Sequence, residues 1–203
     1  MIAIIDYGSG NLRSVSKALE REGADAVLVR SPEELEGARA VVLPGVGAFG
    51  DCARNLRERN LWEPIRRWIG KDKPFLGICL GYQLLFDSSE ETPGETGFGF
   101  FRGKVRRFQT RGLKIPHMGW NNLALAAPGN PLWRGLTADP SVFFVHSYFP
   151  APEDESIVTS RATYGETFAA SAAAGNITGV QFHPEKSQAE GLAILGNFVA
   201  SVS

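Results

Sequence analysis

Cysteine is scarce in this sequence, and neither sign of charge is in surplus. Only two of the 203 residues are cysteine, Cys52 and Cys79, and they form no C-x-x-C pair, which excludes a disulfide framework. Lysine plus arginine number 21 and aspartate plus glutamate number 22, which gives a net charge of −1. Because nucleic acids and anionic membranes both attract basic surfaces, we expect neither as a partner.

Long apolar runs, repeats and a leader segment are also absent. No stretch approaches the roughly 18 apolar residues that a membrane span needs, and the first apolar run ends at Asp6 with no basic residue before it. The chain is 21% charged and 43% apolar, which excludes a largely disordered protein. We therefore expect one globular domain over residues 1–203, located in the cytoplasm.

Strand and helix patterns alternate in the first half of the chain. Short apolar runs predict buried strands at residues 2–5, 26–29, 40–43 and 75–78. Helices are expected after Asn11, which is a candidate helix cap, from Pro32, and over 80–88. Residues 51–70 are also expected to be helical, and Pro64 divides them into two helices. This alternation is typical of a mainly parallel sheet that helices cover on both faces.

After residue 95 the pattern changes to strands separated by Gly and Pro turns. The expected strands lie near residues 98–108, 120–126, 141–149, 156–162, 166–173 and 177–182, and a closing helix covers 187–201. The predicted fold is a single α/β domain. It has a mostly parallel central sheet flanked by helices, with antiparallel strands added in the C-terminal half.

The sharpest local feature is Gly77-x-Cys79-x-Gly81, which follows a buried strand and opens a helix. This pattern indicates a nucleophile elbow, a tight strand-to-helix turn that needs small residues on both flanks. The turn presents the thiol at a helix N-terminus, which favours the thiolate, and aims the amide of Leu80 at a developing oxyanion. The alternative is that Cys79, like Cys52, is a small buried apolar residue.

A cysteine nucleophile needs a base, and His183-Pro184-Glu185 follows an apolar strand pattern. In an extended chain His183 and Glu185 share a face, so the carboxylate is placed to orient the imidazole. Pro184 keeps His183 out of the helical region. The alternative is a solvated turn with no chemical role.

The loop Gly45-x-Gly47-x-x-Gly50 supports a rival function, because a dinucleotide-binding loop also lies between a strand and a helix. Three observations weaken that interpretation. The loop follows the third expected strand, Pro44 removes a backbone donor, and the expected ribose-binding acid would be Asp72 in a polar loop. The same loop can instead supply the backbone amides of Val46 and Gly47 to an oxyanion hole.

Taken together, these segments resemble the class I (triad) glutamine amidotransferases. The shared motifs are Pro44-Gly45-Val46-Gly47, Gly77-Ile78-Cys79-Leu80-Gly81-Tyr82-Gln83 and Gln181-Phe182-His183-Pro184-Glu185. Three further stretches are similar to one subfamily, the glutaminase subunits of imidazole glycerol phosphate synthases. They are Asp6-Tyr7-Gly8-Ser9-Gly10-Asn11-Leu12, Pro116-His117-Met118-Gly119-Trp120-Asn121 and Lys186-Ser187. The resemblance runs from residue 2 to the final helix.

The resemblance implies a reaction that needs no metal or cofactor. Cys79 would attack the side-chain amide of glutamine, His183 would pass the thiol proton to the leaving ammonia, and Glu185 would orient His183. Water would then hydrolyse the thioester to glutamate. The residues implied for binding the amino-acid end of glutamine are Gln83, Glu91, Ser147 and Tyr148. His146 is either a second base or a half-buried strand residue.

The resemblance also implies a partner. In the subfamily the ammonia passes to a β/α-barrel cyclase, which makes imidazole glycerol phosphate and an aminoimidazole carboxamide ribonucleotide in histidine biosynthesis. The implied contacts of this heterodimer are Asn11, Met118, Trp120 and Lys186, each with a structural alternative as cap, core residue or solvated charge. A peptide flip within residues 44–47 would let partner and ligand switch the oxyanion hole on.

Other functions remain open at this point. Within the family, the alternative is a glutaminase that serves anthranilate or aminodeoxychorismate synthase. Outside it, the alternatives are a dinucleotide-dependent α/β enzyme and a cysteine-elbow hydrolase or stress protein of similar fold.

Overall fold

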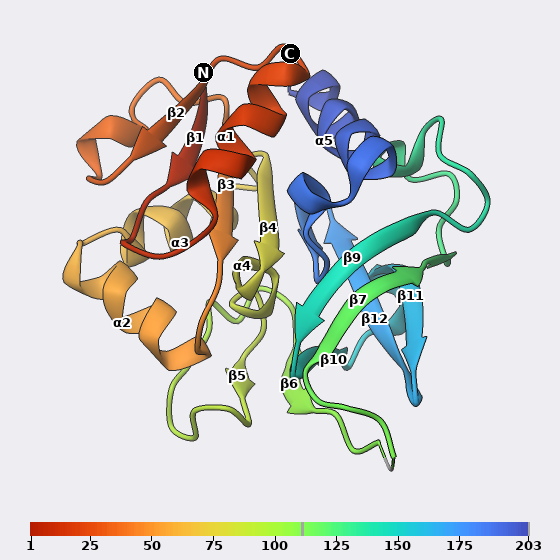
Figure 1. The fold of residues 1–203 in the computed structure, drawn as a ribbon. Coiled ribbons are helices and arrows are strands. Elements are labelled where there is room, and N and C mark those ends of the chain that lie inside the picture. Colours follow the sequence, from red (N-terminus) through yellow and green to blue (C-terminus); the bar gives the residue numbers. More distant parts are fainter. Residues whose placement is uncertain (111, 203) are drawn as a thin grey trace.

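The computed structural model describes residues 1–110 and 112–202 and contains one large sheet (Figure 1). Its eight strands lie in the order β2-β1-β3-β4-β13-β12-β11-β8. The first five strands are parallel: β2 (Ala26–Val29), β1 (Ile2–Ile5), β3 (Ala40–Gly45), β4 (Phe75–Cys79) and β13 (Ile177–Val180). The others continue the sheet antiparallel: β12 (Glu166–Ala174), β11 (Val158–Tyr164) and β8 (Ala124–Leu125). The predicted fold class is confirmed.

Helices cover both faces of the parallel strands. Helices α1 (Leu12–Arg21) and α5 (Gln188–Ser201) pack on one face, and α2 (Phe49–Glu58) and α3 (Trp62–Gly70) pack on the other. Strand β1 contributes Ile2 and Ile4 to the first core and Ala3 and Ile5 to the second, because successive side chains of a strand point to opposite faces. The sheet is therefore buried on both sides, and its carboxyl edge is left for a site.

Two smaller sheets lie against the C-terminal half of the large one. In the first, β6 (Gly103–Arg107) lies between β10 (Tyr148–Pro152) and β5 (Ser88–Ser89). In the second, β7 (His117–Asn122) pairs antiparallel with β9 (Ser141–His146), and Figure 1 shows this pair in front of β11 and β12. Within the part of the chain that the structure describes, four 3-10 helices complete the fold: η1 (Glu33–Leu35), η2 (Pro131–Trp133), η3 (Glu155–Ile157) and η4 (Pro184–Lys186).

Some predicted boundaries are wrong. The helix expected over 80–88 is only one turn long, α4 (Leu80–Gln83). The carbonyl of Leu84 accepts a hydrogen bond from the amide of Phe98 instead of continuing a helix. The break between α2 and α3 lies at Asn60, whose φ is 58°, and Pro64 sits in the first turn of α3, where its missing N–H costs nothing.

Two predicted strands also differ from the structure. The strand expected near 98–108 begins only at Gly103. The strand expected over 120–126 is divided between β7, which starts three residues earlier at His117, and the two-residue β8.

Strand register brings three segments together at the carboxyl edge of the sheet. Gly45 at the end of β3 pairs with Cys79 at the end of β4. On the other side of β4, Ile78 pairs with Val180 at the end of β13, so residues 181–183 continue alongside Cys79. Among the described residues, no helix has the length and apolar character of a membrane span, and no three His, Cys, Asp or Glu side chains are grouped to hold a metal.

Replacing Gly81 with alanine tests the packing on which this edge depends. A Cβ at Gly81 would lie 1.9 Å from the carbonyl oxygen of Leu43, so Gly81→Ala forces the backbone apart. We expect the free energy of unfolding in urea to fall by about 3 kcal/mol or more. At Gly70 a Cβ meets no atom within 4 Å, so the matched variant Gly70→Ala keeps or slightly raises stability. Equal stability of the two variants would contradict this account.

Candidate active site

Cys79 sits on a strained turn between β4 and α4. Its φ of 53° and ψ of −104° are rare for a residue with a Cβ, and such strain persists only where the surrounding structure enforces it. A Cβ at Gly77 would lie 2.6 Å from the carbonyl oxygen of Gly81, so the two flanking glycines allow the strand and the helix to meet. This turn has the geometry of a nucleophile elbow. The thiol is 6% exposed.

His183 and Glu185 form a buried pair next to the thiol. The Nδ1 of His183 lies 2.9 Å from Oε1 of Glu185, and the two side chains are 2% and 1% exposed. Burial alone lowers the pKa of His183, but interactions with Cys79 and Glu185 outweigh it and raise the pKa to about 10. The Nε2 has no hydrogen-bond partner on any other side chain that the structure describes. The imidazole of His183 is therefore protonated at neutral pH, next to the side chain of Cys79.

A cavity of about 350 Å³ opens over Cys79 and His183, a size typical of a small-molecule site. Most of the residues expected from the sequence line it. The full lining consists of Val46, Gly47, Cys79, Leu80, Gln83, Glu91, Pro116, Val145, His146, Ser147, Tyr148 and His183. Residues from six separate parts of the chain thus meet around the candidate nucleophile.

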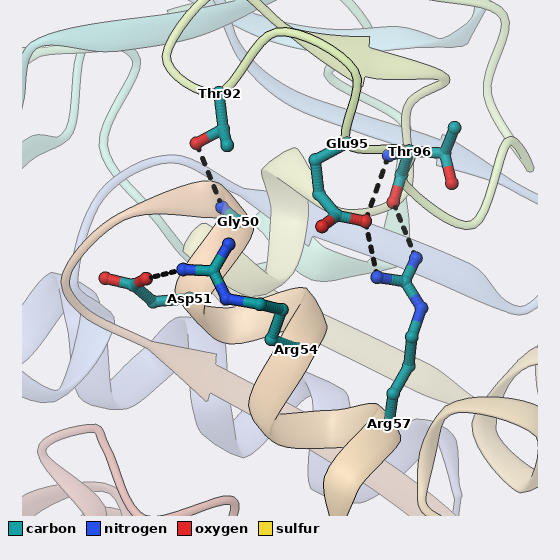
Figure 2. Close-up of polar contacts among 7 residues, drawn as sticks. All are labelled: Gly50, Asp51, Arg54, Arg57, Thr92, Glu95 and Thr96. Atoms are coloured by element: carbon teal, nitrogen blue, oxygen red, sulfur yellow. Dashed lines mark hydrogen bonds and ion pairs between the residues drawn. The ribbon is translucent and has the colours of Figure 1, made fainter.

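Glu91 belongs to a loop that is tied to the start of helix α2. Its Oε2 accepts a hydrogen bond from the amide of Phe49 at 2.8 Å, and Thr92 Oγ1 accepts one from the amide of Gly50 at 3.2 Å. Figure 2 shows the same loop held further along α2, where Arg57 binds Glu95 and the carbonyl of Thr96. Burial raises the pKa of Glu91. The loop caps α2 and holds one carboxylate at the cavity wall.

The same contacts exclude a dinucleotide site at Gly45-x-Gly47-x-x-Gly50. The amides of Phe49 and Gly50 would have to bind a phosphate, but they already donate to Glu91 and Thr92. Gly45 is also packed closely, because a Cβ there would lie 2.7 Å from the Cβ of Leu80. Gly45 and Gly50 therefore serve close packing, since a Cβ at Gly50 would lie 2.6 Å from Cγ2 of Thr92.

The candidate oxyanion loop is held by contacts on its inner side. The hydroxyl of Ser9 donates to the carbonyl of Val46 at 3.1 Å. Burial raises the pKa of the Tyr7 hydroxyl on the same side of the loop. Gly47 has a φ of 98°, a conformation that favours glycine. The backbone amides of Val46, Gly47 and Leu80 are therefore the candidate oxyanion donors beside the elbow.

Gln83 lines the cavity but already uses both hydrogens of its amide. Its Nε2 donates to the carbonyl of Tyr148 at 3.0 Å and to Oε1 of Gln181 at 3.1 Å. Only its Oε1 is left as an acceptor for a substrate. Sequence reasoning missed Gln181 as a site residue, although its spacing of two from His183 places both on one side of an extended segment.

His146 at the cavity wall forms a buried pair with His117, a pairing that sequence reasoning missed. The Nδ1 of His117 and the Nε2 of His146 are 3.0 Å apart, and the rings are packed among Phe144, Tyr164 and Phe168. Burial lowers the pKa of His117 to about 4 and that of His146 to about 3. Both rings are neutral at pH 7, so His146 is a buried strand residue and is not placed as a second base.

The four candidate partner residues lie next to the catalytic segment. Met118 and Trp120 on β7 are 65% and 48% exposed. The ring of Trp120 packs against Phe143 of β9 at 6.1 Å, and the ammonium of Lys186 lies 6.0 Å from the same ring. Asn11 occupies the N-cap position of α1 without a capping side-chain bond. Its Nδ2 instead lies 3.5 Å from Oε1 of Glu185.

Comparisons with known proteins agree with this geometry. The family model for class-I glutamine amidotransferases matches residues 3–202. The chain is 55% identical over 203 residues to imidazole glycerol phosphate synthase subunit HisH of Thermosynechococcus vestitus, covering 99% of this chain and 97% of that one. It is 50% identical over 204 residues to the subunit of the same name from a Synechocystis species, covering 100% and 97%.

Solved structures share the fold at low sequence identity. A structure described as a glutamine amidotransferase matches with a TM-score of 0.77 and 21% identity over 98% of both chains. The PurLQS structure from Thermotoga maritima matches with a TM-score of 0.78 and 19% identity over 100% and 98% of the chains. These two matches support the fold alone.

The histidine pair predicts how stability depends on pH. A histidine that stays neutral when folded but has an ordinary pKa near 6.5 when unfolded makes the unfolded chain bind more protons as pH falls, so folding stability falls with it. At pH 5 this costs about 2 kcal/mol for His146 relative to pH 7.5. Between pH 7.5 and 5 the free energy of unfolding in urea is therefore expected to fall by about 2 kcal/mol less in His146→Gln than in the wild type. An identical pH dependence of the two proteins would contradict it.

Proposed function

Because the chain belongs to the class I glutamine amidotransferase family, we propose that it is the glutaminase subunit of an imidazole glycerol phosphate synthase in histidine biosynthesis. It hydrolyses glutamine to glutamate and supplies ammonia to a cyclase subunit, which makes imidazole glycerol phosphate and an aminoimidazole carboxamide ribonucleotide. The observation that carries the proposal is that Cys79 and His183 line one cavity and that His183 is paired with the buried carboxylate of Glu185. The name that the relatives share favours this synthase over anthranilate or aminodeoxychorismate synthase.

In the first half of the proposed reaction the thiolate of Cys79 attacks the side-chain amide carbon of glutamine. The oxygen of the tetrahedral intermediate accepts hydrogen bonds from the backbone amides of Leu80 and the Val46–Gly47 loop. When the C–N bond breaks, the imidazolium of His183 donates its proton to the leaving nitrogen, and ammonia departs. A thioester on Cys79 and a neutral imidazole remain.

In the second half, water hydrolyses the thioester. Neutral His183 takes a proton from the attacking water, and collapse of the intermediate breaks the C–S bond to release glutamate. The thiolate and the imidazolium are restored together. Glu185 accepts from Nδ1 of His183 throughout, so Nε2 always faces the reacting atoms and the imidazolium is stabilised.

Residues around the cavity would hold the amino-acid end of glutamine. The carboxylate of Glu91, with one oxygen on helix α2, is placed to bind the α-ammonium group. Oε1 of Gln83 is a second acceptor at the wall, and Ser147 and Tyr148 bring backbone groups to the same side. These assignments extend the family pattern to matching positions of this chain.

The partner in this proposal is a β/α-barrel cyclase that binds over the exposed residues Met118, Trp120 and Lys186. Free ammonia is mostly protonated at neutral pH and is then a poor nucleophile, so a shielded transfer to the partner favours a complex. The backbone amide of His183 donates to the carbonyl of Phe143 at 2.9 Å, and Phe143 contacts Trp120. A partner bound to Trp120 is therefore separated from the proposed catalytic base, His183, by a single residue in space, Phe143.

Partner binding would also complete the oxyanion hole. In the free chain the carbonyl of Val46 accepts a hydrogen bond from the hydroxyl of Ser9 at 3.1 Å, which holds the Val46–Gly47 peptide in its present orientation. A flip of this peptide would redirect the amide of Gly47 at the cavity, and the glycine makes such a flip sterically cheap. A free chain with full glutaminase activity would overturn this part of the proposal.

The first test measures glutamate release from glutamine by the chain alone and after addition of a barrel cyclase with its ribonucleotide ligand. We expect little activity alone and a large rise with both additions. Cys79→Ala removes the nucleophile and is expected to lower the stimulated rate by about 10³-fold or more. Cys52→Ala, which changes a buried thiol on α2, is the matched control. Retained activity in Cys79→Ala would contradict the mechanism.

Trp120→Ala tests the partner surface. Large exposed aromatic residues dominate interface energies, so this change is expected to weaken cyclase binding by about 10- to 30-fold, measured by titration calorimetry. Val27→Ala alters a 40% exposed residue on the edge strand β2, at the other end of the sheet. We expect it to leave binding unchanged. Equal affinities of the two variants would place the interface elsewhere.

A further inference from the structure

Gln181 is a buried polar residue that the triad mechanism does not use. It follows β13 directly, and its backbone amide donates to the carbonyl of Ala170 at 2.8 Å. Since Val180 pairs with Ile78, the next residue of each strand, Gln181 and Cys79, come to lie side by side. Gln181 is 0% exposed. A buried amide is costly unless its polar atoms are satisfied, so its partners identify its role.

The side-chain amide of Gln181 connects the thiol to Gln83. Its Nε2 donates to Sγ of Cys79 at 3.5 Å, and its Oε1 accepts from Nε2 of Gln83 at 3.1 Å. The carbonyl of Tyr148 can only accept, so Gln83 must present its NH₂ group there. The second hydrogen of this NH₂ group then points at Gln181, so the atom of Gln181 that accepts it must be the side-chain oxygen Oε1. The N–H of Gln181 is thereby directed at the sulfur.

The histidine pair fixes the other end of the same network. Nδ1 of His146 lies 2.8 Å from the carbonyl of Tyr148 and must carry a hydrogen, so its Nε2 accepts from Nδ1 of His117. Nε2 of His117 in turn accepts from Nδ2 of Asn121 at 3.4 Å. Every group has one consistent direction of donation, and both neutral histidines satisfy it. The carbonyl of Tyr148 is therefore anchored from two sides, and it anchors Gln83.

We propose that Gln181 is a further catalytic residue, which donates a hydrogen bond from its side-chain amide to the sulfur of Cys79. The inference rests on the proposed glutaminase activity. The bond stabilises the thiolate before it attacks the amide carbon. It acts again when the C–S bond of the thioester intermediate breaks and the electron pair returns to sulfur. No proton is transferred from Gln181, because the amide N–H only donates to the negative charge.

Two substitutions separate this role from a structural one. Gln181→Met fills a similar volume but removes both the donor and the acceptor. Gln181→Glu keeps an oxygen for the amide of Gln83 and replaces the donor with a carboxylate oxygen, which places a negative charge against the sulfur. Hydrogen bonds to charged groups are the stronger kind, and losing one is expected to lower kcat by about 10- to 100-fold in each variant. KM for glutamine is expected to stay within about threefold, because Gln181 does not touch the substrate.

The decisive readout is the reactivity of the thiol, measured without glutamine. Iodoacetamide alkylation of Cys79 is followed against pH by mass spectrometry of its peptide, which separates it from Cys52. We expect the pH midpoint of alkylation to rise by about one unit in Gln181→Met and by more in Gln181→Glu. The ionisable groups that interact with this thiol are His183, Tyr7 and Cys52, and both variants leave them in place.

Ser171→Ala is the matched control. Ser171 is also 0% exposed, and its hydroxyl bonds only to Thr159 and Ser160 among the described residues, away from the thiol. A midpoint that stays at the wild-type value in both Gln181 variants, or that moves equally in Ser171→Ala, would overturn the inference. Loss of glutamate release with an unchanged midpoint would do the same, because it assigns Gln181 a structural role. Failure of the wild type to release glutamate with the cyclase would instead refute the proposed function, and the alkylation midpoints would still report on Gln181.

Discussion

The parallel pairing of β4 with its two neighbours is the constraint on which the candidate site depends. Backbone hydrogen bonds place Gly45 beside Cys79 on one side and Val180 beside Ile78 on the other. Because side chains alternate along each strand, a slip of one residue would turn every side chain to the wrong face. The close packing at Gly77 and Gly81 makes this register compatible with a turn as tight as the one at Cys79. These few contacts bring together the candidate nucleophile, base and oxyanion loop.

Around this edge the polar groups form one directed network. From Asn121 to Cys79 each donor meets one acceptor, through His117, His146, the carbonyl of Tyr148, Gln83 and Gln181. A buried network of this kind is stable only when all its members are satisfied. Protonation of either histidine would leave two donors facing each other. Burial keeps both rings neutral and thereby keeps the hydrogen bonds of the cavity wall in one arrangement. The pH dependence of folding stability and the environment of the Cys79 thiol therefore both depend on the burial of these histidines.

The outer side of these strands carries the surface that we assign to the partner. On β7, inward residues such as His117 alternate with outward ones such as Met118 and Trp120. The neighbouring strand β9 bonds to the catalytic segment through the amide of His183 and through the hydroxyl of Ser187, which accepts from the amide of Phe143. Communication between partner and nucleophile needs an element with two arrangements. The glycine-rich loop before α2 is the element of the site best suited to that role.

The sequence by itself determined the features that depend on neighbouring residues. Apolar runs located the first parallel strands, the small residues around Cys79 indicated the elbow, and the spacing of His183 and Glu185 placed them on one face. These patterns arise because backbone preferences and side-chain periodicity act over a few residues.

Only the tertiary structure decided which distant groups share the buried polar contacts. The amide of Asn11 looked like a helix cap and instead reaches Glu185. Helix α4 stops after one turn because the amide of Phe98 binds the carbonyl of Leu84. The partners of Gln181 come from three separate segments. The local sequence around a polar side chain does not specify its hydrogen-bond partner. Packing between segments far apart in the chain selects that partner and thereby sets the role of the side chain.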